Sequence, residues 1–240
     1  MPSIRSYLEE RERARTRGLE RGGAVSLLRR VSPFELRQAA KVRGTALLAP
    51  IERRKAQRYL ATTSEPLRLH LGAGTHRLDG WLNIDVVGMG PDIHWDLRRE
   101  LPFPSGSAQA ILLEHVLEHF SLADGLELLA ECRRLLGQGG VVRVGVPDFG
   151  RYLRSYAGDG EFVDRLRPGR PSRLLAVAEV ALAHGHRSVW DAETLELMLR
   201  ESGFTDVSAR AFGDSAIEPA PDNPAREAET VYAEGRAPGG

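Results

Sequence analysis

The arrangement of hydrophobic and polar residues predicts short β-strands from residue 67 onward. Apolar residues alternate with polar ones over residues 67–71 and 82–86, and residues 92–95 predict a further short strand. Residues 108–113 and 141–146 are instead continuous apolar runs, which is the pattern of strands buried on both faces of a sheet. Five strands are therefore expected before residue 149.

Two amphipathic helices and two late strands complete the pattern. A helix is expected from Ser121, whose hydroxyl can cap it, to Gly137, because apolar residues recur every three or four positions between them. A second helix begins at Asp191. After it, alternation over residues 207–211 and 231–233 predicts two strands that are joined by a loop.

Strands that alternate with helices are typical of α/β proteins. We therefore predict a doubly wound, mostly parallel seven-stranded sheet that occupies residues 67–240. Residues 149–183, after the fifth strand, are interpreted as an insertion with a helix from Pro171, and they could form a lid over a substrate. The natural boundary with the preceding segment is Pro66.

Residues 1–66 are predicted to form a basic, helical N-terminal extension. They hold 15 basic and 7 acidic side chains, whereas the remainder holds 18 and 26. Helix formers predict helices over residues 7–17 and 33–43, and a third that begins at Pro50. The opposite charges favour packing of the extension on the following domain, with arginine stems along apolar surface. A docking surface for nucleic acid, anionic lipid or an acidic protein is the alternative; aromatic residues at stacking spacing are missing, which disfavours nucleic acid.

Composition excludes several classes of protein. The chain has 240 residues, of which 42% are hydrophobic, enough for a sizeable core. Its one cysteine, Cys132, excludes an internal disulfide framework and a multi-thiolate zinc site. No run approaches the ~20 apolar residues of a membrane helix, and the first 30 residues lack the pattern of a secretory signal. A cytoplasmic protein is expected.

Candidate functional residues lie at the carboxyl ends of the predicted strands, where open α/β sheets bind their ligands. Gly72 and Gly74 follow the first strand, and glycine there lets the backbone approach a ligand closely. Asp85 ends the second strand and can accept hydrogen bonds from a ribose diol, and Asp96 follows the third and could accept from an adenine amino group. The later strand ends are occupied by Glu114, His115 and Asp148.

The spacing of these residues argues against a nicotinamide or flavin site. Such sites have the pattern GxGxxG, then a full helix, then an acidic residue ~20 positions further on. Here Arg77 stands at the third glycine position, and only six residues separate Gly74 from Trp81.

The motifs resemble those of the class I S-adenosylmethionine-dependent methyltransferases, in particular a compact bacterial branch. The matching segments are LHLGAGTHRLDGWLNID (69–85), DL (96–97), LPF (101–103), EHVLEHF (114–120), ECRRLLGQGGVVRVGVPD (131–148) and ESGF (201–204). The resemblance covers residues 67–148 and, more loosely, 184–238. This chain differs from the pattern in having Ala73 where cysteine is commoner, and its first crossover is too short for a helix.

The resemblance implies S-adenosyl-L-methionine as the cofactor and assigns residues to it. The implied residues are Leu71, Gly72, Ala73 and Gly74 at the methionine end, Asp85 at the ribose hydroxyls, Asp96 and Leu97 at the adenine, and Glu114 and His115 near the methyl group.

Methyl transfer to an oxygen atom requires a base in addition to the cofactor. His115 is the first candidate, because an imidazole titrates near neutral pH; His186 and Asp148 are weaker candidates. The loop that contains His184 and His186 could contact the substrate. The full set of residues predicted for the acceptor is Asp148, Tyr152, His184 and His186.

Residues 115–119 (HVLEH) also match HxxEH, an inverted zinc-protease motif. A five-residue match often arises by chance, and this one lies within the methyltransferase order of motifs. No metal is therefore expected, and Glu118 and His119 are interpreted as residues that cap or orient the loop.

The sequence thus predicts a methyltransferase that acts on a small or sugar-like acceptor. One alternative is a binding or regulatory module that keeps the fold without turnover. Another is a methyltransferase that acts on RNA or protein, guided by the basic extension. The identity of the acceptor and the oligomeric state are left open.

Overall fold

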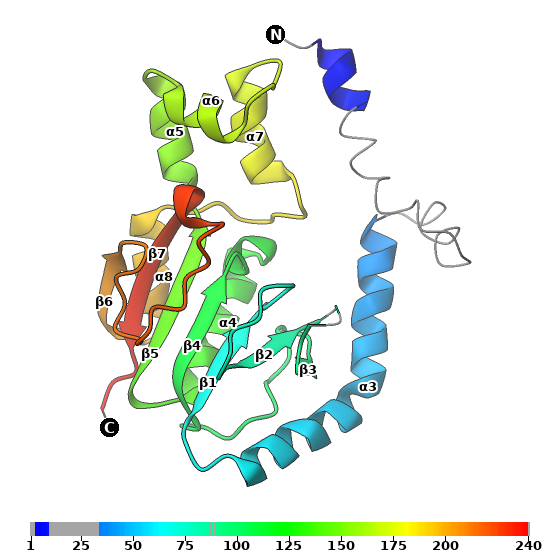
Figure 1. The fold of residues 1–240 in the computed structure, drawn as a ribbon, viewed down its shortest axis with the longest axis vertical. Helices are drawn as coiled ribbons and strands as arrows, with labels where there is room; N and C mark the ends of the chain where they lie inside the picture. The colour runs from blue at the N-terminus through cyan, green and yellow to red at the C-terminus, as the bar shows by residue number, and fades with distance from the viewer. Residues whose placement is uncertain (1–2, 10–33, 87, 89, 240) are drawn as a thin grey trace.

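A computed structural model describes residues 3–9, 34–86, 88 and 90–239. Seven strands form one sheet in the order β3-β2-β1-β4-β5-β7-β6 (Figure 1). Their bounds are β1 Leu67–Leu71, β2 Leu82–Asp85, β3 Ile93–His94, β4 Ala108–Glu114, β5 Leu136–Pro147, β6 Thr205–Arg210 and β7 Thr230–Arg236. β1 to β5 are parallel, and β7 runs antiparallel to β5 and β6. The predicted mostly parallel, seven-stranded α/β fold is confirmed.

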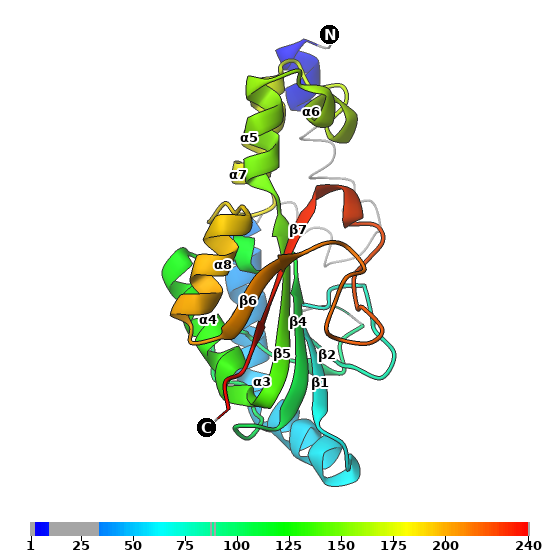
Figure 2. The ribbon, with the colours of Figure 1, turned by 90° about the vertical axis from the view of Figure 1, so that its left-hand side faces the viewer.

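Helices and loops share the two faces of the sheet. The helices are α3 Phe34–Thr62, α4 Leu122–Leu135, α5 Phe149–Ala157, α6 Glu161–Leu166, α7 Arg173–Leu182 and α8 Ala192–Glu201, with short 3-10 turns η2 Leu117–His119 and η3 Glu227–Glu229. Figure 2 shows α4 and α8 on one face, and loops on the other. Residues 72–81, between β1 and β2, contain no helix, as the short crossover predicts. Ile217, in the loop between β6 and β7, packs on Leu112 and Trp81 on the loop-covered face.

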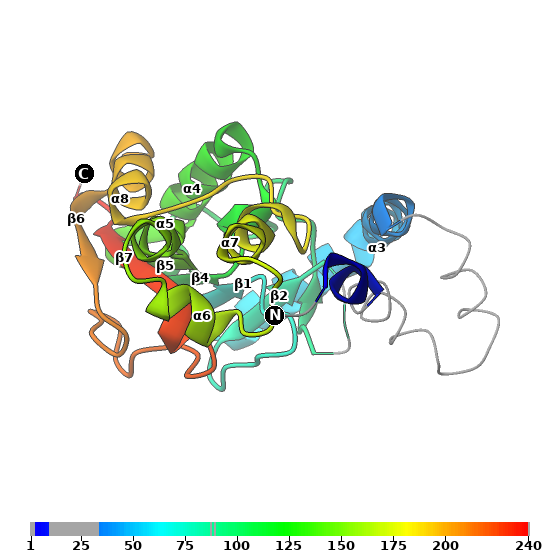
Figure 3. The same ribbon diagram turned by 90° about the horizontal axis from the view of Figure 1, so that it is seen from above.

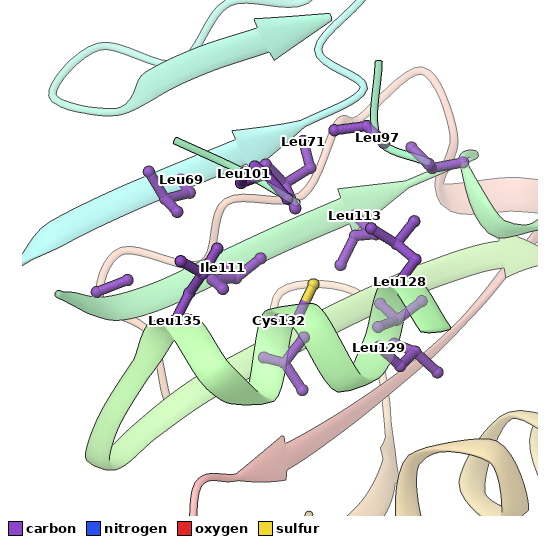
Figure 4. Packing of buried hydrophobic residues seen from close by; sticks show 14 of the residues in the cluster. Leu69, Leu71, Leu97, Leu101, Ile111, Leu113, Leu128, Leu129, Cys132 and Leu135 are labelled. Carbon is purple, nitrogen blue, oxygen red and sulfur yellow. The ribbon is translucent and has the colours of Figure 1, made fainter. Parts of the chain in front are cut away.

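The main hydrophobic core lies between the sheet and α4. Alternate residues of β1 and β4 face the same side as the apolar stripe of the helix, and Figure 4 shows this interlayer packing. The labelled side chains are Leu69, Leu71, Leu97, Leu101, Ile111, Leu113, Leu128, Leu129, Cys132 and Leu135. Burial raises the pKa of the Cys132 thiol, so this cysteine acts as a core residue.

The predicted helix boundaries are partly right. The Ser121 hydroxyl accepts a hydrogen bond from the Asp124 backbone N–H at 3.1 Å and caps α4 as expected. The helix ends at Leu135, before Gly137, because Leu136 is already extended and pairs with Ala108 of β4. At the other end of the chain, one long helix replaces the two predicted ones, and Pro50 lies inside it. Figure 1 shows α3 changing direction along its length.

The end of α3 packs on the edge of the sheet next to β3. Ala49 and Ala56 are buried in the main core, and Arg53 lies over the ring of Trp95, 5.2 Å from its centroid. Glu52 is buried, and its carboxylate accepts a hydrogen bond from the backbone N–H of His94 at 3.0 Å. The predicted helix over residues 7–17 lies mostly outside the described residues. Within residues 3–9, the hydroxyl of Tyr7 donates a hydrogen bond to Glu179 of α7.

Residues 149–182 form a separate group of helices, α5 to α7, beyond the carboxyl ends of the strands (Figures 1 and 3). The group has a hydrophobic cluster of its own, which contains Tyr152, Phe162, Val163, Ala176, Val177 and Val180. Among the described residues, no helix combines the length and the apolar character needed to cross a membrane.

Candidate functional site

The turn after β1 depends on glycine. Gly72 and Gly74 have φ angles of 74° and 54°, in the left-handed region that other residues rarely adopt. The N–H groups of Gly72 and Ala73 both donate to the carbonyl of Ile84 at 2.8 and 3.1 Å, which folds the turn over β2. A Cβ atom on Gly72 would lie 2.3 Å from Val116 Cγ2, whereas one on Gly74 would meet no atom within 4 Å. Gly72 is thus required for packing, and Gly74 borders open space.

Asp85 lies directly beside this turn. Its Oδ2 accepts a hydrogen bond from the Gly74 N–H at 2.8 Å. The structure therefore brings together the glycines and the carboxylate that the sequence assigned to one cofactor, although they lie on different strands. A carboxylate that is oriented by a backbone N–H is suited to bind a ribose diol.

Asp96 and Leu97 follow β3 and are both buried. Asp96 forms a two-pronged ion pair with Arg98, in which Nε lies 2.9 Å from Oδ1 and Nη2 lies 3.0 Å from Oδ2. The hydrogen bonds to Asp96 raise the pKa of Arg98. Leu97 belongs to the main core. The segment after β3 is therefore held by the Asp96–Arg98 ion pair and by the burial of Leu97.

Glu114 is held at the end of β4 by two hydrogen bonds. Its Oε1 accepts from the hydroxyl of Tyr232 at 2.7 Å and from the backbone N–H of Asn223 at 3.1 Å. Burial and the nearby negative charge raise the pKa of Tyr232, so its hydroxyl remains a donor. Glu114 therefore ties β4 to β7 and to the loop before it.

His115 has an unusual backbone conformation. Its φ angle is 56°, in the left-handed region, and its N–H donates to the Gly145 carbonyl at 2.8 Å. Its ring lies between Thr230, with Nε2 2.8 Å from Oγ1, and Glu118, with Nδ1 3.4 Å from Oε1. Such strain in a non-glycine residue often marks a functional site.

A cavity of about 300 Å³ lies next to His115, between the strand ends and α7. Its lining residues come from β5, η2, α7, η3 and the loops beside them. They are His115, Glu118, His119, Pro147, Arg167, Arg170, Glu179, Val180, His184, His186, Arg226 and Glu229. Three residues predicted for catalysis or for the acceptor, His115, His184 and His186, therefore share one cavity.

Asp148 and Tyr152, also predicted to contact the acceptor, do not line this cavity. Asp148 caps α5, with its Oδ1 accepting from the Arg151 N–H at 2.8 Å. Tyr152 is fully buried among apolar residues, and its hydroxyl donates to Glu229 at 3.1 Å. Burial raises the pKa of Tyr152. The structure gives both residues a role in positioning the helices.

A group of possible ligand side chains lies at the wall of the cavity. One ligand atom each of Glu118, His119 and His186 lies within 4.8 Å of the others. The rings of His119 and His186 are 5.1 Å apart. The HxxEH pattern contains the first two residues, but it gives no sign that His186 joins them.

A second arrangement that the sequence did not reveal is a buried ion network behind the site. Arg143 of β5 is fully buried and binds Asp222 through Nε at 2.5 Å and Nη2 at 2.6 Å. Its Nη1 also donates to Glu234 at 2.9 Å. This network fixes the loop before β7, which also positions Asn223 against Glu114. The sequence does contain one sign of this network, because Arg143 interrupts the apolar run of residues 141–146.

A family model described as a methyltransferase domain matches residues 46–209. No curated protein is similar enough to count as a match. Among similar solved structures, the S-adenosylmethionine-dependent methyltransferase SibL in its apo form is 18% identical, with a TM-score of 0.44 over 73% of this chain and 52% of that one. A methyltransferase of the same cofactor class from Archaeoglobus fulgidus is 14% identical, with a TM-score of 0.46 over 85% and 100% of the two chains. Human N-acetylserotonin methyltransferase in complex with S-adenosylmethionine is 16% identical, with a TM-score of 0.44 over 72% and 48%.

The chain spans about half the length of SibL and of the human enzyme. The family model, in contrast, covers more than half of the chain and includes both the glycine turn and the cavity wall up to His186. The chain therefore belongs to the methyltransferase-domain family.

Proposed function

We propose that this protein transfers a methyl group from S-adenosyl-L-methionine to a small, polar acceptor that binds in the cavity beside His115. The observation that carries the proposal is the hydrogen bond between Gly74 and Asp85 at the carboxyl ends of β1 and β2. The same turn contacts Val116 through Gly72, and Val116 adjoins His115 in the cavity wall. The turn and the cavity are thus linked through the neighbouring residues Val116 and His115.

The residues around the turn fit the cofactor. Gly74 leaves room for a ligand next to the backbone, since a Cβ there would meet nothing within 4 Å. Asp85 would bind the ribose hydroxyls, and residues 71–74 would line the methionine end. We assign the adenine to Asp96 and Leu97, and the region of the methyl group to Glu114 and His115.

S-adenosylmethionine supplies, when bound, an electrophilic methyl group on a sulfur that leaves as a neutral thioether. The residues of the chain therefore need to align the acceptor and exclude water rather than protonate a leaving group. His115 is the proposed base that takes the proton of an acceptor hydroxyl. Thr230 fixes the plane of its ring, and Glu114 holds the strand end from which it projects.

The size and charge of the cavity favour a small acceptor without net charge. About 300 Å³ lies at the lower end of small-molecule sites. Each arginine in the wall has a glutamate of the same wall as its partner: Arg167–Glu229 at 2.7 Å, Arg170–Glu179 at 2.9 Å and Arg226–Glu229 at 3.7 Å. Paired charges and imidazoles suit the hydroxyl groups of a sugar-like molecule better than a polyanion such as RNA.

Methyl-labelled S-adenosylmethionine and a fractionated cell extract test this proposal. Label is expected in the small-molecule fraction, and His115→Ala should lower turnover by about 100-fold or more while the affinity for S-adenosylhomocysteine stays within a few-fold. Label in the RNA or protein fraction would favour a macromolecular acceptor. Cofactor binding without release of the methyl group in any fraction would favour the non-catalytic module.

A further inference from the structure

We infer that Glu118, His119 and His186 form a binding site for one divalent transition-metal ion at the wall of the cavity. Their ligand atoms lie within 4.8 Å of one another. Two imidazoles and one carboxylate are a ligand set that zinc and its neighbours accept, whereas magnesium and calcium prefer oxygen ligands alone. The inference departs from the expectation from sequence, which assigned no metal to the HVLEH segment.

The environment of Glu118 supports the site independently. Its side chain is 2% exposed, and neither carboxylate oxygen has a hydrogen-bond partner among the described residues. The nearest nitrogen of His115, Nδ1, lies 3.4 Å away. Burying a carboxylate without hydrogen bonds is costly, and a cation bound to it offsets that cost.

The ring of His186 is oriented as in a metal ligand. Its Nδ1 lies 2.6 Å from the carbonyl oxygen of Val180, to which it donates a hydrogen bond. That bond leaves Nε2 as the unprotonated nitrogen, with a lone pair for a metal. Histidines that bind metals commonly donate their second N–H to a carbonyl or carboxylate in this way.

The two segments that supply the ligands are joined without any metal. The backbone N–H groups of Arg187 and Ser188 donate to the carbonyl of Glu118 at 2.7 and 3.3 Å. The Ser188 hydroxyl also donates to the carbonyl of Leu117 at 3.2 Å. The backbone around His186 is therefore held against η2, and only side-chain rotations are needed to bring the ligand atoms to a metal.

The ligand atoms need to approach one another by at most about 1.5 Å. A tetrahedral zinc ion with bonds of about 2.0–2.1 Å has ligand atoms roughly 3.3–3.4 Å apart. Three protein ligands leave a position open, and the cavity is on the side of that position, since all three residues line it. Given the proposed function, the open position would take an oxygen atom of the acceptor, which makes an acceptor with a hydroxyl group the expected class.

Titration of metal-free, tag-free full-length protein with Co²⁺ and with Zn²⁺ tests the site. Calorimetry should show one ion per chain, and Co²⁺ should develop visible absorption bands of a low-coordinate site. Glu118→Gln, which is close in shape to the natural side chain, and His186→Ala should each weaken metal binding by about 100-fold or more. Loss of a residue that only hydrogen-bonds to a metal ligand costs ~10–100-fold. The control His184→Asn removes an imidazole from the same cavity and should leave the affinity within a few-fold.

Wild-type protein that binds Co²⁺ and Zn²⁺ no more tightly than the Glu118→Gln and His186→Ala variants would overturn the inference, provided that circular dichroism shows all of them folded. Affinity for S-adenosylhomocysteine, measured on the same samples, separates the two proposals. Cofactor binding without metal binding would remove the metal site and leave the proposed function intact. Metal binding without cofactor binding would contradict the proposed function and leave the metal site intact.

Discussion

At the scale of single residues, the two glycines of the turn after β1 are glycine for different reasons. Both have a positive φ angle, which alone costs an L-residue roughly 1–2 kcal/mol. Only Gly72 faces a close neighbour, because an added Cβ would lie 2.3 Å from Val116. Packing therefore requires glycine at position 72, whereas position 74 borders open space that we propose the cofactor fills.

We expect Gly72→Ala to lower the free energy of unfolding by about 2–5 kcal/mol, since overpacking adds to the backbone strain. Gly74→Ala should lower it by only about 1–2 kcal/mol, yet weaken cofactor binding, because its methyl group would occupy the space beside Asp85. Urea unfolding and calorimetry measure the two effects. Val116→Ala in the Gly72→Ala background should restore part of the stability. Equal losses in the two single variants would contradict this explanation.

His70 of β1 makes stability depend on pH. It is buried, and burial is the main cause that lowers its pKa from 6.5 to about 4; the hydrogen bond to Asn83 opposes the shift. Because the pKa is lower in the folded state, the neutral ring stabilises the fold above pH 6.5. That contribution is lost as the pH falls from 6.5 to about 4. The shift corresponds to about 3 kcal/mol at most.

His70→Gln should therefore flatten the fall in stability between pH 6.5 and 4, although it weakens the fold at neutral pH. Urea unfolding of both proteins at several pH values gives the two slopes. His94→Gln serves as a control for loss of an imidazole near the sheet edge. Parallel slopes for wild type and His70→Gln would show that His70 titrates normally in the folded protein.

Single residues at the strand ends, and three histidines of the cavity, could be predicted from sequence, whereas the grouping of the possible metal ligands could not. Asp85 and Glu114 follow directly from where an apolar run stops, and they lie there in the structure. The meeting of His186 with Glu118 and His119 depends on the path of α5 to α7, which no local pattern encodes. Asp148 and Tyr152 show why such assignments need the structure, since polar groups near a strand end can also cap helices or support packing.

At the scale of elements, the strands and α4 are close to their predicted positions, because periodicity reports which face is buried. The prediction that a helix begins at Pro50 was wrong, because α3 begins at Phe34 and contains this proline. The helix continues through it, since Ala49 and Ala56 on either side are buried against the sheet. β5 also begins earlier than its apolar run, because Leu136 already pairs with β4.

The ion network of Arg143 connects β5 to β7 and to the loop before it. Arg143→Met would leave Asp222 buried without its cation and Glu234 with only the more distant Arg210, at 3.8 Å. We expect a loss of about 3–5 kcal/mol in the free energy of unfolding, as for other broken buried pairs. Arg173→Ala, which removes the exposed pair with Asp164, should cause no measurable change. Similar urea midpoints for Arg143→Met and wild type would contradict the assigned role.

At the scale of the whole molecule, the basic N-terminal segment is joined to the sheet by the end of α3. Residues 49–60 supply buried alanines, the Glu52 hydrogen bond to His94 and the contact of Arg53 with Trp95. The Arg53 head over the Trp95 ring is a cation–π contact at the sheet edge, which differs from the predicted packing of arginine stems with heads in water. The charge of the segment alone did not reveal which of its residues make this contact.

Two truncations separate the packed part of the extension from the rest. Deletion of residues 1–60 should lower the melting temperature by roughly 10 °C, the equivalent of a few kcal/mol, and increase the binding of a hydrophobic dye. Deletion of residues 1–45 keeps Ala49, Glu52 and Ala56 and should cost much less. Equal stability of both truncated proteins and the full chain would show that α3 is not part of the stable fold.

The most direct test of the proposed function is calorimetric titration of the full chain with S-adenosylhomocysteine. The wild-type protein should bind one molecule per chain. Asp85→Ala should weaken that binding by about 1.5–3 kcal/mol, the usual effect of a lost hydrogen bond to a charged group, without changing the melting temperature by more than a few degrees. No measurable binding by the folded wild-type protein, or unchanged affinity in Asp85→Ala, would contradict the cofactor site described at the ends of β1 and β2.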